Sequence, residues 1–499
     1  MMSQAPNQNH AETTDSQFSK TDGATPVHSR PRIFRNTVAM GVGSNLNALG
    51  RLVVLALIVR TCGATLFAWY VLLVEILKIV EWLVDFGTTE VFVREMNRRP
   101  EAREHLLRLL TAMKLISAPA ACVVLGLTFV AMQYPASVVR AGLLGVFGLI
   151  SYGAIVIYRA IYRADLSMER EIGAEMLSVV TLMVAVLLIV GPETSLLTLF
   201  ACFIGSRVLF SILCVLFGRS AYRPSIRGVK AADLRWGFHT TVLIGAIGFM
   251  LFVYQSVEFI ILSKFGDEMD LAFYSGAQRL AWPLLMLLGA IGATMYSVLA
   301  VHWPDARKEF IRVCQRGFDT VLLVGGVALS PLIAAPTFFI GLLGEELVPG
   351  APALQVIAVL CLLKAISMTV GSTLYVVHAQ RLVFVFVGIA LLVKIPLIIY
   401  AAPRYGFMGV VYAALLVELL LVALPSLFFV WRQTGFLPGW SVALRVILAG
   451  VIAIGGARWV LPDESLWTAV LAGVIYVIIV LASGAVRWSE LRSLGTRRG

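Results

Sequence analysis

Charged residues are scarce in this sequence. Asp, Glu, Lys and Arg make up 14% of its 499 residues, hydrophobic residues make up 59%, and the mean hydropathy is +0.88. A water-soluble chain of this length needs more charge to cover its surface, so the composition excludes a soluble globular protein. The net charge of +11 does not indicate a nucleic-acid binder, because the basic residues are spread a few at a time between apolar runs.

The sequence also lacks the short motifs of metal, nucleotide and disulfide sites. Its six cysteines and six histidines form no CxxC or HExxH pair, and no GxxxxGKS or GxxxxGKT loop is present. Gly41 and Gly43 open an apolar run instead of following a strand, which argues against a dinucleotide fingerprint. We therefore expect no metal, no cofactor and no ATPase in this chain, and we interpret the cysteines as small packing residues.

Long polar segments between the apolar runs are missing as well. On one side of the predicted membrane the gaps are short, and none offers room for an aqueous domain. Membrane-embedded polysaccharide polymerases and ligases need such a segment to hold an acceptor and catalytic acids. The pattern therefore favours a carrier over an enzyme, and we predict no catalytic residue.

What the sequence does contain is a series of fourteen apolar runs. About 20 apolar residues cross about 30 Å of hydrocarbon as a helix, so the runs predict an all-α polytopic membrane protein with about 14 transmembrane helices. The predicted spans are residues 37–59, 66–87, 107–132, 138–158, 172–190, 196–217, 238–262, 271–300, 317–343, 354–377, 383–402, 408–430, 441–461 and 466–486.

The basic residues fix the predicted orientation. Most of the 40 lysines and arginines lie before the first span, after the last one, or in alternate gaps such as 94–103 and 219–235, whereas gaps such as 267–270 are acidic. Because basic residues remain on the cytoplasmic side, we predict that both termini are cytoplasmic. The polar residues 1–35 predict a disordered tail, and the length of the first apolar run gives no reason to expect a cleaved signal peptide.

A basic linker divides the first twelve spans into two sets of six. We predict an N-terminal lobe at 36–217, a cytoplasmic linker at 218–237, a C-terminal lobe at 238–432, two additional spans at 433–486 and a tail at 487–499. The Ala-Trp-Tyr sequence at 68–70 and the Ala-Phe-Tyr sequence at 272–274 stand at equivalent outer turns of the two lobes. This match indicates a parallel repeat, which transporters use to build a central site.

Span 2 carries four ionisable residues, Glu75, Lys78, Glu81 and Asp85. Their spacing places them on one helical stripe, and a charge at the centre of a span costs at least about 2.5–3.5 kcal/mol. One interpretation is a self-neutralised set packed between helices. We favour a stripe that lines a wet cavity, because the set keeps net negative charge and therefore needs an outside partner.

Depth along the helices suggests that partner. Arg51, Glu75 and Arg279 each lie about 12–14 Å below the outer boundary, at 1.5 Å of rise per residue. Glu75 and Arg279 are also equivalent in the repeat alignment, because each follows the matched tyrosine by the same number of residues. We hypothesise that they approach each other between the lobes with Arg51 beside them. Lys394 and Glu418, at similar depths in consecutive spans, are expected to form a separate ion pair.

Four further segments carry a resemblance to a known superfamily. They are LVDFG at 83–87, FYSGAQRLAWP at 273–283, LGEELVPGAPAL at 343–354 and YGFMGVVYAA at 405–414. In this order and spacing they resemble the multidrug/oligosaccharidyl-lipid/polysaccharide exporter superfamily, particularly its polysaccharide and lipid-linked oligosaccharide flippases. The resemblance implies two six-helix lobes around a central cavity that opens alternately to each side, with two extra C-terminal helices as in some members. It also implies that Arg279 is a cavity arginine.

These observations lead to one preferred function. We hypothesise a flippase of the bacterial inner membrane that moves polyprenyl-diphosphate-linked oligosaccharide for surface-polysaccharide assembly. Arg51, Lys78 and Arg279 would attract the diphosphate, while Glu75, Glu81 and Glu258 would restrain the arginines or titrate with a coupling proton or sodium ion.

The expected partners are the lipid-linked oligosaccharide, membrane lipids and polysaccharide assembly proteins, with no nucleic acid. Two alternatives lie within the same superfamily, a flippase for a peptidoglycan lipid precursor and an ion-coupled multidrug antiporter. The antiporter should have a mainly acidic and aromatic cavity. A polymerase or ligase is the alternative from another class.

Overall fold

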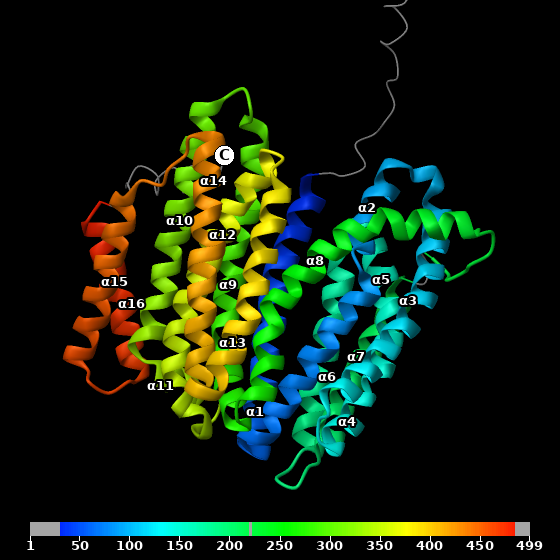
Figure 1. Cartoon of the computed structure of the whole chain (residues 1–499), viewed down its shortest axis with the longest axis horizontal. Coiled ribbons are helices and arrows are strands. Elements are labelled where there is room, and N and C mark those ends of the chain that lie inside the picture. Colours follow the sequence, from blue (N-terminus) through cyan, green and yellow to red (C-terminus); the bar gives the residue numbers. More distant parts are fainter. Residues whose placement is uncertain (1–29, 219–221, 485–499) are drawn as a thin grey trace, which may run out of the picture.

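The computed structural model of the chain describes residues 30–218 and 222–484, and this part is a bundle of long helices without strands (Figure 1). Most of the predicted N-terminal tail and the predicted tail at 487–499 lie outside the described residues. Helix α1 already begins at Arg30 and α8 already begins at Ala231. Both helices therefore start earlier than the spans expected at 37 and 238.

The first half of the chain forms one group of helices. They are α1 (Arg30–Asp85), α2 (Thr88–Arg98), the short η1 (Pro100–Ala102), α3 (Arg103–Met132), α4 (Ala136–Leu143), α5 (Gly145–Ala164), α6 (Met168–Ile189) and α7 (Leu196–Gly218). Within this N-terminal lobe α5 packs between α3 and α7, and α6 packs against α1 and α7. In Figure 1 the lobe occupies the right-hand side of the bundle.

The second half forms another group. It comprises α8 (Ala231–Phe265), α9 (Glu268–His302), α10 (Arg307–Ala334), α11 (Pro336–Leu343), η2 (Glu345–Gly350), α12 (Ala351–Val376), α13 (Gln380–Val417), η3 (Glu418–Ala423), α14 (Leu424–Thr434), α15 (Trp440–Val460) and α16 (Leu466–Ala482). In this C-terminal lobe α12 packs against α9 and α10, and α13 packs against α8. The last two helices, α15 and α16, lie together at the outer edge against α10 (Figure 1).

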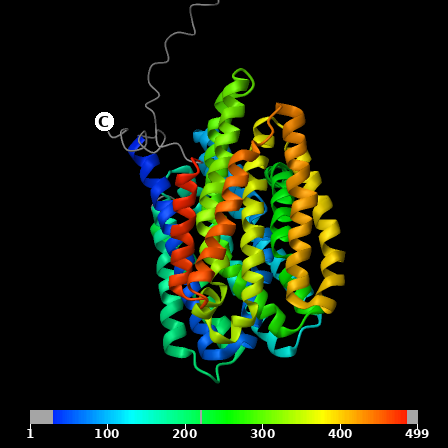
Figure 2. The ribbon, with the colours of Figure 1, turned by 90° about the vertical axis from the view of Figure 1, so that its left-hand side faces the viewer.

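The helices supply the predicted number of crossings. Within the described residues, 11 helical stretches are long and apolar enough to span a membrane. Two of them, Asn45–Arg98 and Arg381–Thr434, have 54 residues each and fold back on themselves. Together with the shorter apolar helix Leu466–Ala482 they give fourteen passages. Because the number of passages is even, the start of α1 and the end of α16 lie at the same end of the bundle (Figure 2).

Glycines make both fold-back points possible. Gly63 has φ 83° and Gly406 has φ 56°, a region of backbone conformation that residues with a Cβ rarely adopt. Each glycine separates two consecutive spans that the sequence places on either side of it. The ninth predicted span differs from the structure, because it breaks at Ala335. Pro336 follows at the start of α11, where a residue without an N–H cannot continue the previous helix.

The two lobes touch at both ends of the second half of α1. Near Gly63, the Arg60 guanidinium donates to the Leu342 carbonyl at 2.9 Å, and the Glu346 carboxylate accepts from the Ala64 N–H at 2.7 Å. Near the other end, Trp82 Nε1 donates to the Gly245 carbonyl at 3.2 Å. Glu75 and Lys78 lie between these contacts along the helix, so the charged level of α1 is enclosed by the junction of the lobes.

A close helix contact attaches the last two helices to the rest. A Cβ added at Gly326 of α10 would stand 2.0 Å from the Tyr476 hydroxyl of α16, and Tyr476 is fully buried. We expect Gly326→Ala to push α16 away from α10 and to cost about 1–3 kcal/mol, the usual range for overpacking. A lower thermal midpoint of the detergent-solubilised protein would show it. The matched control is Gly450→Ala, because nothing lies within 4 Å of the Cβ position there; equal midpoints for the two variants would contradict the prediction.

Candidate binding cavity

A cavity of about 260 Å³ lies inside the N-terminal lobe and reaches the C-terminal lobe at one residue. Helices α1, α5, α6 and α7 form most of its wall, and Arg279 of α9 closes one side. Its polar lining residues are Arg51, Tyr70, Lys78, Glu81, Tyr152, Arg159, Glu175, Ser178, Ser206, Arg207 and Arg279. We call this space the N-lobe cavity.

Glu75 joins the two lobes at the level that depth arithmetic predicts. Its carboxylate accepts from Lys78 Nζ at 3.0 Å and forms an ion pair with Arg279. The second carboxylate oxygen lies 3.5 Å from the Ser256 hydroxyl of α8. Glu75 is only 5% exposed and is absent from the cavity lining, whereas Lys78 and Arg279 belong to it. One buried carboxylate therefore holds two cations from behind, and the cations face the cavity.

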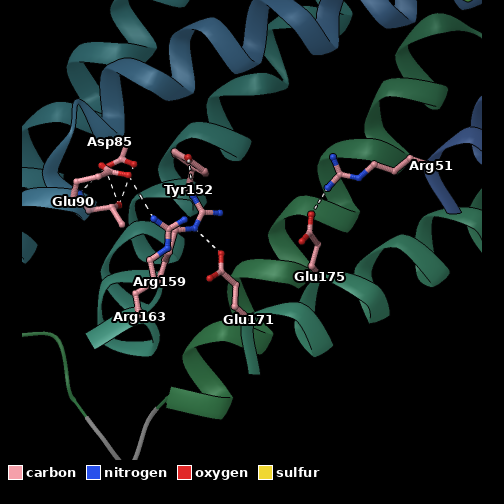
Figure 3. Close-up of polar contacts among 9 residues, drawn as sticks. Arg51, Asp85, Glu90, Tyr152, Arg159, Arg163, Glu171 and Glu175 are labelled. Carbon is pink, nitrogen blue, oxygen red and sulfur yellow. Dashed lines mark hydrogen bonds and ion pairs between the residues drawn. The ribbon is translucent and has the colours of Figure 1, made fainter. Parts of the chain in front are cut away.

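Arg51 lies beside this group and has its own partner. Its guanidinium donates to the Glu175 carboxylate of α6 at 2.5 Å, and both side chains remain partly exposed, at 46% and 29%. Figure 3 shows this pair bridging α1 and α6. Because an exposed ion pair contributes little to stability, Arg51 can exchange Glu175 for another anion at small cost.

A second hollow of about 280 Å³ lies between α1 and α9, at the junction of the lobes. We call it the interlobe hollow. Its wall contains Asn47, Trp282, Pro283 and Met286 in addition to residues that the N-lobe cavity also exposes. The shared residues are Arg51, Leu55, Lys78, Glu175 and Arg279. The wall between the two spaces therefore carries three cations and one carboxylate.

Glu81 lies deeper in the N-lobe cavity with a partner that sequence reasoning left unassigned. Arg207 of α7 donates to the Glu81 carboxylate at 2.6 Å, and its guanidinium lies 5.5 Å from the centre of the Tyr152 ring. Arg159 packs on the same ring at 5.8 Å and donates to Glu171 of α6 at 2.5 Å (Figure 3). Tyr152 thus lies within cation–π distance of both arginines.

Two of these charged residues gave a usable signal in the sequence. Arg159 did not, because it lies just beyond the predicted span 138–158, although α5 continues through it to Ala164. Glu171 and Glu175 are four residues apart on α6, a spacing that places two carboxylates on one face of a helix. A search for acids at this spacing beside the predicted cavity would have found them.

Asp85, the fourth residue of the charged stripe, stabilises the turn between α1 and α2. Its carboxylate accepts from the Thr88 hydroxyl at 2.9 Å and from the Thr89 N–H and hydroxyl at 3.0 Å. Lys114 of α3 donates to the Val84 carbonyl at 2.6 Å and to the Thr88 hydroxyl at 2.7 Å in the same turn. Figure 3 shows Asp85 turned toward this turn. These contacts assign it a local structural role.

Glu258 occupies a different part of the molecule from the other candidate residues. It is fully buried in the C-terminal lobe, is absent from the lining of both spaces, and forms an ion pair with Lys394 of α13. The prediction that Lys394 pairs with Glu418 is therefore wrong. Glu418 instead accepts from the Tyr254 hydroxyl at 2.8 Å, and Lys394 also donates to the Tyr254 carbonyl at 2.6 Å.

Several solved structures share this fold. The lipid II flippase MurJ in an inward closed conformation is 13% identical, with a TM-score of 0.72 over 91% of this chain and 99% of that chain. An inward-facing multidrug resistance MATE family transporter of the MOP superfamily is 13% identical, with a TM-score of 0.62 over 81% of this chain and 98% of that one. A MOP superfamily transporter from Pyrococcus furiosus is also 13% identical, with a TM-score of 0.57 over 82% and 97%.

A bundle of apolar crossings around a charged internal cavity is the architecture of a multi-pass membrane protein, and the solved structures that share it are those of a flippase and of transporters. The sequence identifies the family: residues 33–300 match the family model described as polysaccharide biosynthesis protein. This match covers more than half of the chain, and the chain belongs to that family. No curated protein matches it in sequence. The predicted fold is confirmed. The family match and the shared fold agree with the predicted exporter superfamily and with a transporter.

Proposed function

We propose that this protein moves polyprenyl-diphosphate-linked oligosaccharide across the bacterial inner membrane for surface-polysaccharide assembly. Its two lobes would rock about their junction and expose the cavity to each side in turn, with both termini in the cytoplasm. The sugars would travel through the polar cavity while the isoprenoid chain remains in the lipid. The membership of the polysaccharide biosynthesis protein family supports this class of cargo.

The observation that carries the proposal is the charge of the wall shared by the two spaces. It exposes Arg51, Lys78 and Arg279 but only one carboxylate, Glu175. Arginine presents a planar fork of donors that matches phosphate oxygens, and charge-assisted hydrogen bonds of this kind are among the strongest in proteins. The diphosphate of the proposed cargo is an anion that these three cations would bind. A cation-exporting cavity would need the opposite balance of charge.

The carboxylates would keep the cations in place while the cavity is empty. Glu75 holds Lys78 and Arg279 from behind, and Glu175 holds Arg51 from the side. An arriving diphosphate would replace Glu175 on Arg51, and because both side chains are partly exposed this exchange would cost little. We propose that Glu75, Glu81 and Glu175 also decide whether a proton or a sodium ion accompanies the cargo.

A second candidate is a flippase for a peptidoglycan lipid precursor, because the solved lipid II flippase covers 91% of this chain and the inward-facing multidrug transporter covers 81%. Such a cargo would meet the same cations. The two candidates differ in the glycan, so the experiment must compare glycans directly.

Reconstitution of the full chain into proteoliposomes tests the proposal. The vesicles would contain a polyprenyl-diphosphate disaccharide with a fluorescent sugar, and a membrane-impermeant reductant would quench only the label in the outer leaflet. Protein-free vesicles should retain the inner-leaflet signal. We expect vesicles with the protein to lose it, because the labelled lipid reaches the outer leaflet within the assay. Retention of the inner signal with every lipid-linked glycan tested, including a peptidoglycan precursor, would refute both candidates.

A further inference from the structure

The interlobe hollow contains a buried polar group without a partner. Asn47 of α1 is 5% exposed and lines the hollow, and its amide nitrogen has no hydrogen-bond partner among the described residues. Buried side-chain donors are almost always paired, and leaving one unpaired costs about 1–3 kcal/mol. An unpaired buried amide in the wall of a cavity is the feature expected where a ligand supplies the missing acceptor.

Arg279 adds a second unpaired donor to the same wall. One of its terminal nitrogens is occupied by Glu75, but its Nε is buried and has no partner. Pro283, four residues further along α9, also lines the hollow. A proline has no N–H, so it cannot donate to the carbonyl four residues before it. The Arg279 carbonyl therefore lacks the donor that a helix normally supplies.

Beyond Arg279, the part of the wall that α9 contributes is apolar and includes a large aromatic ring. Trp282, Pro283 and Met286 of α9 line the hollow together with Asn47 of α1. Tryptophan combines a broad apolar face with a single polar N–H. A ligand that fits this surface must present an apolar face to the ring and accept hydrogen bonds from an amide and from a guanidinium nitrogen. A pyranose ring has these properties, because its C–H groups form one face and its hydroxyls surround the edge.

Position decides which sugar of the cargo reaches this hollow. The hollow shares Arg51, Lys78 and Arg279 with the proposed diphosphate site, so a group bound there is directly bonded or adjacent to the diphosphate. We propose that the interlobe hollow binds the sugar attached to the diphosphate, with Asn47, Trp282 and Arg279 as its contacts. This inference rests on the proposed function. It makes Asn47 and Trp282 the residues that distinguish a glycosylated carrier from the bare carrier lipid.

Binding measurements on two lipids test the inference. The full-length protein in lipid nanodiscs would be titrated with polyprenyl diphosphate and with polyprenyl-diphosphate N-acetylglucosamine, and the ratio of their Kd values gives the contribution of the sugar. The same ratio would be measured with a hexose in place of the N-acetylhexosamine. In the unmodified protein we expect the better glycosylated lipid to bind about 10-fold or more tightly than the bare lipid, since a site with unpaired polar groups discriminates against a ligand that leaves them unpaired.

Asn47→Leu and Trp282→Leu should each remove most of this ratio while leaving the Kd of the bare lipid within about 2-fold, because neither change touches the cations. Trp282→Phe should restore part of the ratio, since it restores a ring. Matched controls are Asn97→Leu on the exposed face of α2 and Trp459→Leu on α15, whose side chain is 86% exposed. Both controls should keep the full ratio.

The outcomes separate the two proposals. Equal Kd values for glycosylated and bare lipid in the unmodified protein would overturn the inference and leave the diphosphate site intact. A ratio unchanged in both Asn47→Leu and Trp282→Leu would overturn it as well. Failure of the unmodified protein to bind either lipid would instead refute the proposed function. Retained binding of the bare lipid shows that a variant is folded, so loss of the sugar-dependent ratio cannot be attributed to unfolding.

Discussion

Replacing Arg279 with glutamate is expected to abolish glycan export while leaving the chain inserted in the membrane. The change removes a cation that faces both the N-lobe cavity and the interlobe hollow. It also places a second carboxylate beside Glu75, which Arg279 now neutralises together with Lys78. We expect at least a 100-fold loss of flipping rate, because the diphosphate of the proposed cargo would meet a repulsive carboxylate in place of a guanidinium donor. The lipid-flipping assay and the amount of protein in the membrane fraction measure the two effects separately.

A charge exchange distinguishes cargo binding from a purely structural ion pair. In the double variant Glu75→Arg with Arg279→Glu, the two side chains can still pair, but the cation now occupies the buried position behind the wall. A structural role predicts that the exchange restores activity. A role in cargo binding predicts a stable protein that remains inactive, whereas Arg279→Lys retains part of the rate because it keeps the positive charge. Full activity of the exchanged variant would contradict the proposed role.

The contact between Glu75 and Arg279 could be predicted because a helix converts residue number into depth. Both residues belong to uninterrupted spans, so counting from the outer ends placed them at one level, and the structure joins them. The fold-back points at Gly63 and Gly406 fell between predicted spans for a related reason. A membrane forces apolar runs of nearly constant length, which fixes where each turn lies. The depth of a residue along its helix and the position of each turn could therefore be predicted from the sequence.

The direction in which a side chain points around its helix was not accessible in the same way. Lys394 and Glu418 lie at similar depths, yet Lys394 points toward Glu258 of α8, which is far away in the sequence. Several acidic residues lie at a depth where Lys394 could reach them, and the packing of α8 against α13 determines which one it contacts. Arg207 illustrates the same limit. Its charge in an apolar span marked it as unusual, but nothing in the sequence indicated that it turns toward Glu81 and Tyr152.

Ion pairs connect α6 to two neighbouring helices. Two of its acids, Glu171 and Glu175, form ion pairs with arginines from two different helices, α5 and α1. The second of these arginines, Arg51, lines both spaces. In the proposed function, a cargo anion that takes Arg51 from Glu175 would remove one contact between α6 and α1. Binding would then be coupled to the packing of α6 only if the bound and free states differ in such contacts.

The buried pair of Glu258 and Lys394 gives the second large expected effect, on folding instead of transport. Both side chains are at most 1% exposed, and Lys394 has further contacts with the Tyr254 carbonyl at 2.6 Å and the Tyr254 ring at 4.2 Å. Glu258→Met alone would leave an unpaired buried ammonium, and Lys394→Met alone would leave an unpaired carboxylate. Each single change should destabilise the protein by about 3–5 kcal/mol. The thermal midpoint in detergent and the yield of protein in the membrane measure this loss.

The double variant Glu258→Met with Lys394→Met should recover most of the stability that either single change removes. Removal of both charges eliminates the desolvation cost together with the attraction, and well-packed apolar replacements for buried pairs are often neutral or stabilising by about 1–4 kcal/mol. The exposed pair of Glu309 and Arg312, 3.5 Å apart with 47% and 61% exposure, provides the control. Its removal by Glu309→Ala should cost at most about 1 kcal/mol. If the double variant were as unstable as the single ones, the two charges would stabilise the lobe through contacts other than their own pairing.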